Sequence, residues 1–391
     1  MRTRAFIVLA LFISALAFSK QGYCTANNWA QPTTDIHMCY TDIAPLYGAR
    51  DLTEWPYSHG DQSLEYPVIT GVITYLLAQP TNTANTFYFF NVFFIIFLFI
   101  GTALLIHKFK PEYSYLYLVA PAGVLALFIN WDLWGIVSMV AAIIWFDRKR
   151  YDFSAVALAV SISTKFMPIF LFIPIILLLW RRKEIQELLR YAIIAIASFA
   201  IINLPVLLTT PQAWLHFYLF NIDRKADWGS LWYALQTYKV GFADLNVVMT
   251  IFMVIAIAIA SLVIVGARAP IALADVSFIV MALVFTASKV YSPQYVLWLI
   301  PLAVLALKDK KDLHAFWIWQ GGEVLYFVAI WQHLALIQGA KYGLSVEHYA
   351  LAIFIRILCT IYLLERFISR LRVKIHKGAA DFLFEGASSY P

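Results

Sequence analysis

Charged side chains are scarce in this sequence. Only 13% of its 391 residues are charged, whereas 62% are hydrophobic and 17% are aromatic. Soluble domains carry about 25% charged residues, so this composition excludes an ordinary soluble protein. The apolar residues fall in long runs, which is typical of a chain that crosses a membrane repeatedly. The sequence therefore predicts an all-α integral membrane protein.

Motifs that bind metals or nucleotides are also missing. The 3 cysteines and 8 histidines form no cluster with metal-ligand spacing, and no Gly-rich phosphate loop or Ser-His-Asp arrangement is present. We therefore expect no metal and no cofactor. The net charge of +6 comes from short basic clusters between the apolar runs. Such clusters are typical of inner membrane loops, and no nucleic-acid partner is expected.

The N-terminal region predicts an anchor followed by a polar loop. Residues 1–18 have the basic start and the apolar length of a signal peptide, and small residues near its end would allow cleavage. A retained anchor is expected, and in either case residues 21–66 form the first outer loop. Cys24 and Cys39 would pair if this loop faces an oxidising compartment, but the sequence leaves the disulfide open. Cys359 lies in an apolar run and is expected to be a packing residue.

About twelve membrane spans are predicted, with both termini cytoplasmic, because most basic residues then lie in inner loops. Pro67–Leu77 is too short to cross the bilayer and is predicted to be an interfacial helix. Residues 1–370 form a single polytopic domain, and residues 371–391 form a basic, partly disordered cytoplasmic tail. The expected spans cover residues 5–18, 87–106, 115–129, 133–146, 153–180 as a hairpin, 188–208, 247–265, 271–287, 296–307, 314–330 and 349–364.

The apolar run at residues 153–180 has basic clusters at both ends. If positive residues stay inside, this run has to be a hairpin of two short helices that turns near Ser163–Pro168. A single helix would place Lys165 within the bilayer, where a lysine costs about 2.5–3.5 kcal/mol. The hairpin is therefore expected, with Lys165 toward the outer face.

Polar residues beside aromatics and prolines collect on the outer face of this topology. They are Asp42, Glu65, Asp132, Lys165, Arg224, Lys225, Asp227, Lys289, Tyr291 and His333. The inner loops are short and basic, so the chemistry is expected outside, where ATP and nucleotide sugars are absent. A transfer reaction there needs an activated donor that reaches it within the membrane, such as a sugar on a lipid phosphate.

Two kinds of side chain would serve such a transfer. A carboxylate can deprotonate an acceptor hydroxyl, and Asp42 is the first candidate base and Glu65 the second. Cations neutralise the charge that develops on a leaving phosphate. The candidates for that role are Arg224, Lys289 and Lys165. The other carboxylates of this part of the loop are expected to be solvated, and they are Asp51, Glu54 and Asp61.

Structural roles stay open for the same residues. Asp42 and Asp132 are each placed to cap a helix that starts at the next residue. Lys165 could snorkel to the surface from a helix end, and residues 224–227 could anchor the chain at the interface. His333 is a lone histidine without metal-ligand spacing, for which a structural role is the first interpretation.

Six segments carry a resemblance to a known family. They read YTDIAPLY (residues 40–47), WPY (55–57), EYPVITG (65–71), STKFMP (163–168), DRKADWGSLWY (223–233) and SKVYSPQYVLWLIP (288–301). In this order, over nearly the whole chain, they resemble the polyprenol-phosphate-mannose-dependent mannosyltransferases of glycosyltransferase family 87. That family belongs to the GT-C superfamily, in which several families share an acidic first outer loop.

The resemblance implies a GT-C-type multi-span helical bundle with a catalytic first outer loop. It also implies a polyprenyl-phosphate sugar donor and a metal-independent, inverting transfer. Asp42 matches the catalytic aspartate by position. Lys289 and Tyr291 would lie near the donor phosphate, and Arg224 near the lipid carrier or the acceptor. Two further candidate substrate contacts are His333 and Trp228.

We therefore expect the transfer of a hexose, with mannose as the first candidate, to a lipid- or glycan-linked hydroxyl. The site would face outward from the plasma membrane, among membrane lipids. A multi-span transporter or lipid-carrier flippase is the main alternative, and it would need charged residues at midplane and usually internal repeats. Glu323 and Arg356 are the clear intraspan charges, and they could form a buried pair. A non-catalytic scaffold would leave the outer charges unexplained.

Overall fold

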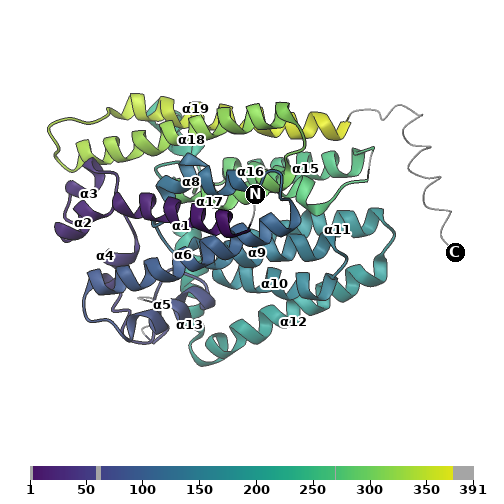
Figure 1. Cartoon of the computed structure of the whole chain (residues 1–391), viewed down its shortest axis with the longest axis horizontal. Coiled ribbons are helices and arrows are strands. Elements are labelled where there is room, and N and C mark those ends of the chain that lie inside the picture. Colours follow the sequence, from purple (N-terminus) through teal and green to yellow (C-terminus); the bar gives the residue numbers. More distant parts are fainter. Residues whose placement is uncertain (1–2, 59–62, 269, 373–391) are drawn as a thin grey trace.

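The computed structural model of this chain describes residues 3–58, 63–268 and 270–372, and within them it contains helices and no strand (Figure 1). The all-α prediction is confirmed. In chain order the elements are α1 (Thr3–Ser19), α2 (Gly22–Ala26), α3 (Thr33–Ile36), α4 (Ile43–Ala49), α5 (Val68–Ala78), α6 (Ala84–Phe109), α7 (Tyr115–Val119), α8 (Pro121–Ala126), α9 (Asp132–Asp147), α10 (Tyr151–Thr164), the 3₁₀ helix η2 (Met167–Leu171), α11 (Phe172–Arg181), α12 (Ile185–Thr209), α13 (Pro211–Asp223), α14 (Leu231–Thr237), α15 (Leu245–Gly266), α16 (Leu273–Ala287), the 3₁₀ helix η3 (Pro293–Tyr295), α17 (Val296–Ala306), α18 (Lys310–Ile337) and α19 (Val346–Arg372).

Three of these helices, α6, α12 and α15, are long and apolar enough to cross a membrane. Shorter apolar helices such as α1, α10 and α16 accompany them. This set agrees with a multi-span membrane protein. In the described part of the chain, helix length and composition do not establish the predicted number of twelve spans.

The two ends of the bundle carry different elements. Helix α1 runs toward the end that carries α2, α3 and α4, whereas α19 starts near that end and runs to the opposite one (Figure 1). The start of α1 and the end of α19 therefore both lie away from the end that carries α2, α3 and α4 (Figure 1). The predicted tail beyond residue 372 lies outside the described residues.

Proline breaks divide the helices, and only part of this division was predicted. Helix α10 ends at Thr164 and Lys165 is extended, so the break expected near Ser163–Pro168 is confirmed. The span expected at 115–129 is not one continuous helix, because α7 and α8 form two short helices there. Pro121 begins α8 after an extended Ala120, and a proline has no N–H with which to continue the preceding helix.

Helix α18 is longer than the sequence suggested. It was expected to end at residue 330 and to be followed by an outer loop at 331–347, but it continues to Ile337. Trp331 and His333 are buried, at 3% exposure each, because they pack against other helices instead of facing solvent. The connection to α19 is correspondingly short. The helix predicted at Pro67–Leu77 forms as α5, and its interfacial position stays a prediction.

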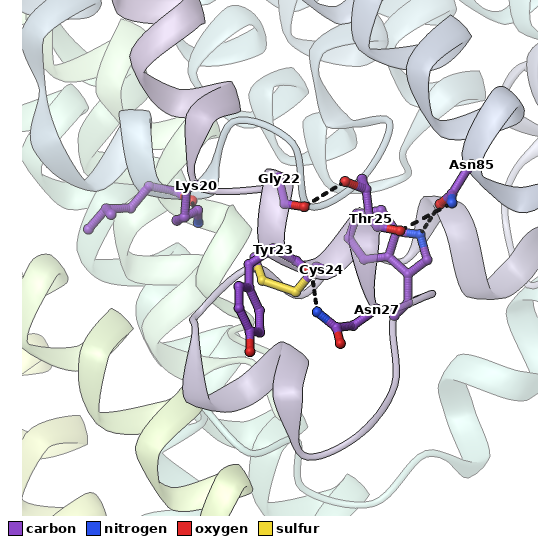
Figure 2. Close-up of a disulfide and its surroundings, with 10 residues drawn as sticks. Lys20, Gly22, Tyr23, Cys24, Thr25, Asn27 and Asn85 are labelled. Atoms are coloured by element: carbon purple, nitrogen blue, oxygen red, sulfur yellow. Dashed lines mark hydrogen bonds between the residues drawn. A yellow bond between two sulfur atoms is a disulfide. The ribbon is translucent and has the colours of Figure 1, made fainter.

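A disulfide fixes the first outer loop near its start. Cys24 in α2 is bonded to Cys39, and both residues are fully buried (Figure 2). The loop is also held to α6, because the indole of Trp29 donates to Asn85 Oδ1 at 2.8 Å. Asn85 in turn donates to the carbonyl oxygen of Thr25 at 3.2 Å. The segment just before Asp42 is thus held covalently and by hydrogen bonds.

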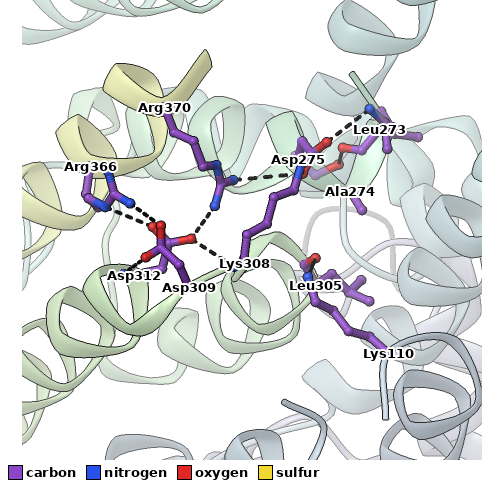
Figure 3. Close-up of polar contacts among 12 residues, drawn as sticks. Lys110, Leu273, Ala274, Asp275, Leu305, Lys308, Asp309, Asp312, Arg366 and Arg370 are labelled. Atoms are coloured by element: carbon purple, nitrogen blue, oxygen red, sulfur yellow. Dashed lines mark hydrogen bonds and ion pairs between the residues drawn. The ribbon is translucent and has the colours of Figure 1, made fainter. Parts of the chain in front are cut away.

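Ion pairs interlock the helix ends at the opposite end of the bundle (Figure 3). Asp312 of α18 is fully buried and pairs with Arg366 at 2.9 Å and with Arg370, both of α19. Lys308 pairs with Asp275 of α16 at 2.7 Å. Lys308 belongs to a basic cluster that the predicted topology places inside. Lys308 therefore also has a structural role, because its ion pair ties the segment before α18 to the start of α16.

Glu323 of α18 and Arg356 of α19 form a buried ion pair. Arg356 Nε lies 2.9 Å from Glu323 Oε2, and the two side chains are at most 1% exposed. The guanidinium also lies over the rings of Tyr291 and Tyr326, 3.5 and 4.1 Å from their centroids. The buried pair of Glu323 and Arg356 that the sequence allowed is therefore present. Because structural contacts satisfy these charges, the pair gives no support to a transporter.

The change Glu323→Gln should lower the free energy of unfolding by about 3–5 kcal/mol, because it leaves the Arg356 guanidinium buried without a counter-charge. The melting temperature of the detergent-solubilised protein measures this loss. Arg190→Gln is the matched control, since Arg190 and its partner Asp152 are 57% and 43% exposed. Exposed pairs contribute about 0–1 kcal/mol. Equal melting temperatures for the two variants would contradict the expectation.

Candidate functional site

A cavity of about 1020 Å³ is lined by segments that are far apart in the sequence. The segments are the first outer loop, the residue pair before α5, the break after α10, the end of α13 with the loop that follows, the start of α15, the turn at 288–295 and part of α18. Of the candidate residues, those that line it are Asp42, Glu65, Lys165, Arg224, Lys225, Asp227, Trp228 and Lys289. The structure therefore brings most of the predicted site together.

Asp42 precedes α4 and presents its carboxylate to the cavity. Its side chain makes no capping hydrogen bond. The N–H of Ile43 instead donates to the hydroxyl oxygen of Thr41 at 3.1 Å. Tyr40 donates to Asp42 Oδ1 at 2.7 Å, and Asn130 Nδ2 lies 3.5 Å from Asp42 Oδ2. Asp42 therefore does not cap α4, which was the structural role open from the sequence.

The surroundings of Asp42 favour a base. Burial raises the pKa of this carboxyl above its ordinary value of 3.8, and the hydrogen bond from Tyr40 and the charge of Lys165 oppose that rise without cancelling it. A carboxylate with a raised pKa accepts a proton more readily than a solvated one. Asp42 is therefore a partly desolvated carboxylate with neutral hydrogen-bond donors on both oxygens.

Glu65 lies in the same cavity but is held by a cation. Arg50 Nε donates to Glu65 Oε2 at 3.0 Å, and Arg50 Nη2 contacts the other carboxylate oxygen. Burial raises the pKa of Glu65, but the contacts with Arg50 outweigh this effect and the pKa lies below its ordinary value. Of the two predicted bases, Glu65 is therefore the weaker.

Lys165 faces the cavity and pairs with Asp132. Lys165 Nζ lies 3.1 Å from Asp132 Oδ1 and 4.7 Å from the centre of the Tyr66 ring. Asp132 is the first residue of α9, and within the described residues neither of its carboxylate oxygens accepts a hydrogen bond from a backbone N–H. The sequence-based interpretation of Asp132 as a helix cap is therefore wrong, because its carboxylate provides the counter-charge for Lys165.

Lys289 offers a cation without a carboxylate partner. Its Nζ donates to Asn246 Oδ1 at 2.5 Å and to the carbonyl oxygen of Ile222 at 2.6 Å, and the residue is 4% exposed. Within the described ranges, no carboxylate oxygen lies within 4.0 Å of this ammonium group. Its charge is therefore available to an anion that enters the cavity.

Arg224 belongs to a loop that is tied to the turn at 288–292. Arg224 Nη2 lies 3.1 Å from Asp227 Oδ1, and its side chain is 37% exposed. Asp227 in turn accepts from the hydroxyl of Ser292 at 2.8 Å, and its N–H donates to the carbonyl oxygen of Lys289 at 2.8 Å. The cluster at 224–227 is thus built into the cavity wall and is more than a solvated anchor.

Two predicted contacts lie away from the cavity. Tyr291 is fully buried, and its hydroxyl donates to Glu323 Oε1 at 3.3 Å. His333 stacks on Tyr349 with ring centres 4.7 Å apart, and Nδ1 lies 3.0 Å from the carbonyl oxygen of Leu344. Neither residue lines the cavity, whereas Trp228 does. His333 has the structural surroundings that a lone histidine suggests.

Several residues at or beside the cavity were not predicted from the sequence. Tyr40, two positions before Asp42, could have been noticed as a hydrogen-bond donor within the same motif. Asn246 and Trp331 of the cavity wall, and Asn130 beside Asp42, carry no local signal, because each is placed by packing between elements that are distant in the sequence. Asp51 and Glu54 are exposed as expected, and Asp61 lies outside the described residues.

Comparison with known proteins identifies one family. A family model described as ALG3 protein matches residues 65–264, which is just over half of the 391 residues. The matched region includes Glu65, Lys165 and Arg224 but stops short of Asp42 and Lys289. A comparison with curated proteins finds no match. The family match gives no support to glycosyltransferase family 87, but it agrees with the broader GT-C class.

Gly229 should tolerate no side chain. A Cβ atom there would overlap the carbonyl oxygen of Tyr291 and the hydroxyl of Tyr326. Gly229→Ala should therefore displace the loop that carries Arg224 and lower stability by about 1–3 kcal/mol, measured as a fall in melting temperature. Gly241→Ala is the control, since a Cβ there meets nothing within 4 Å. An unchanged melting temperature in Gly229→Ala would show that this loop is not fixed against the turn.

Proposed function

The chain belongs to the ALG3 protein family, whose members are GT-C-type membrane mannosyltransferases, and from this we propose that it transfers mannose from dolichyl phosphate mannose to a lipid-linked oligosaccharide. The linkage formed is α-1,3, as the family assignment suggests. The main support for the proposal is that Asp42 and Lys289 line the same cavity. Among the described residues, the Asp42 carboxylate forms no ion pair and the Lys289 ammonium group has no carboxylate partner.

The proposed reaction is a single displacement. A hydroxyl oxygen of the acceptor attacks C1 of the mannose and forms the new glycosidic bond. The bond between C1 and the phosphate oxygen breaks, dolichyl phosphate leaves, and the acceptor proton passes to Asp42. One displacement at C1 inverts its configuration. No metal takes part in this scheme, because protein cations face the leaving phosphate.

Lys289 and Arg224 are proposed to hold the leaving phosphate. Positioned cations stabilise the charge that develops on a phosphate oxygen, and a site with little water strengthens that interaction. The exposed Lys225 lies beside them on the cavity wall. Phe220 and Ile222 on the same wall are 38% and 57% exposed, which suits the first isoprene units of a dolichyl chain.

The endoplasmic reticulum membrane replaces the plasma membrane as the proposed location, because it is typical of the ALG3 family. The cavity would then face the lumen. The Cys24–Cys39 disulfide supports this orientation, since disulfides persist in oxidising compartments and both cysteines belong to the loop that carries Asp42. The termini are proposed to lie on the cytosolic side, where the basic loops would also lie.

The change Asp42→Asn should reduce mannose transfer by at least about 10²-fold without lowering the melting temperature, because it removes the proton acceptor and keeps the shape of the side chain. Transfer from radiolabelled dolichyl phosphate mannose to a lipid-linked oligosaccharide, with purified protein, measures the loss. Asp51→Asn is the matched control, since Asp51 lies in the same loop but is exposed. Full transfer by the Asp42 variant would remove it as the base.

The pH dependence of transfer should follow the ionisation of Asp42. A base must be deprotonated to act, so kcat/KM should fall as the pH drops through the pKa of this carboxyl. Because burial raises that pKa, the fall should begin at a higher pH than the ordinary value of 3.8 would give. Initial rates across the acidic range test this. A rate that stays level down to the pH of an ordinary aspartate would contradict it.

The change Lys289→Ala should raise the KM for dolichyl phosphate mannose and lower kcat, with a total loss of about 10²–10³-fold in kcat/KM, because one cation on the phosphate is removed. The KM for the oligosaccharide acceptor should change little. Lys341→Ala, an exposed lysine away from the cavity, is the control. Donor kinetics that do not change would assign Lys289 a purely structural role.

A further inference from the structure

Lys165 and Asp42 line the same cavity, and Lys165 pairs with the buried carboxylate of Asp132. Lys165 Nζ is 3.1 Å from Asp132 Oδ1, and no nitrogen–oxygen distance of 4.0 Å or less joins Lys165 to Asp42. We propose that Asp132 is a positioning residue that holds the Lys165 ammonium group away from the Asp42 carboxylate, so that Asp42 stays free to accept a proton. This inference rests on the proposed function, because it takes Asp42 as the base.

Asp132 has a strong physical reason to retain the lysine. Its side chain is completely buried, and within the described residues neither carboxylate oxygen accepts a hydrogen bond. A buried carboxylate without a counter-charge is strongly destabilising, because the charge has lost its hydration and gained no partner. Lys165 is the cation that removes this penalty. Moving the ammonium group to Asp42 would restore the penalty at Asp132.

The backbone on both sides of the pair is fixed. Lys165 follows the end of α10, where Thr70 donates to the carbonyl oxygen of Thr164 at 2.6 Å. One turn earlier, Ser161 donates to the carbonyl oxygen of Gly135 in α9 at 2.7 Å. These contacts hold the end of α10 to α5 and to the start of α9. Asp132 and Lys165 therefore meet at a set position and not through a flexible loop.

Asn130 connects the two carboxylates. Its Oδ1 accepts the backbone N–H of Asp132 at 3.0 Å, and its Nδ2 lies 3.5 Å from Asp42 Oδ2. Asp42 thus receives neutral donors, Tyr40 and Asn130, where a cation could otherwise bind. The titratable groups that act on Asp42 come from four segments: Tyr40 from its own segment, Tyr66 before α5, Asp132 of α9 and Lys165 after α10. Helix α18 contributes a neutral side chain, because Trp331 stacks on Tyr40.

Direct pairing of Lys165 with Asp42 would impair a base in two ways. An adjacent cation lowers the pKa of a carboxylate by about 1–3 units, which weakens its affinity for the acceptor proton. The ammonium group would also cover an oxygen that the acceptor hydroxyl has to reach. Lys165 is therefore assigned to the electrostatics of Asp42 and not to the donor phosphate.

A set of variants separates this role from a structural one. Asp132→Asn frees Lys165 to pair with Asp42, so kcat/KM should fall at least about tenfold. The double variant Asp132→Asn with Lys165→Gln removes the competing cation, and it should be several-fold more active than Asp132→Asn alone. A double variant that is folded but no more active than Asp132→Asn would overturn the proposal.

Infrared titration of the Asp42 carboxyl band, assigned with Asp42→Asn, gives a readout without turnover. The band should disappear at lower pH in Asp132→Asn than in the unchanged protein. Asp312→Asn is the matched control, since Asp312 is equally buried and ion-paired but lies at the opposite end of the bundle. An Asp42 band unaffected by Asp132→Asn would overturn the proposal.

Two further outcomes are informative. If Asp132→Asn does not fold, the double variant tests the proposal. Its Asp42 carboxyl band should disappear at the same pH as in the unchanged protein or at a higher pH. A band that disappears at a lower pH would overturn the proposal. If the unchanged protein transfers no mannose, the proposed function fails. The infrared shift would still support the role of Asp132 in that case.

Discussion

The hydrogen bonds from the Arg356 guanidinium to the backbone of the turn at 288–292 are the contacts on which the cavity depends. Arg356 Nη1 donates to the carbonyl oxygen of Tyr291 at 2.8 Å, and Nη2 lies 3.4 Å from that of Ser292. Glu323 balances the charge, so a strong donor can stay buried between α18 and α19. The turn is therefore held by two helices and is not left to solvent.

The turn at 288–292 in turn fixes the loop that carries Arg224. Asp227 binds Ser292 and the backbone of Lys289, and it also pairs with Arg224. The opposite wall is fixed separately, by the Cys24–Cys39 disulfide and by Ile129 and Asn130, which precede α9 and contact the backbone and the carboxylate of Asp42. The proposed base and the proposed cations thus lie on loops, but the helices that hold these loops set the distance between them. Functional residues are commonly positioned in this way, on loops that a rigid scaffold supports.

The sequence predicted helices and the main break well, because apolar runs and Pro168 act locally. It missed the break at Pro121, where a run of uniform hydropathy hid the start of a second helix. Asp42 could be singled out because an aspartate among aromatics and a proline in an outer loop is unusual. The partnership of Asp132 with Lys165 could not, since it depends on how α9 and α10 pack. The inward direction of Tyr291 was equally hidden, because neighbouring turn residues can face either way.

A structure of the protein with a non-transferable analogue of dolichyl phosphate mannose is the most direct test of the proposed site. We expect C1 of the sugar to lie beside Asp42 and the phosphate to lie between Lys289 and Arg224. A phosphate bound among Lys308, Arg366 and Arg370 at the opposite end of the bundle, with the cavity beside Asp42 holding no sugar, would contradict it.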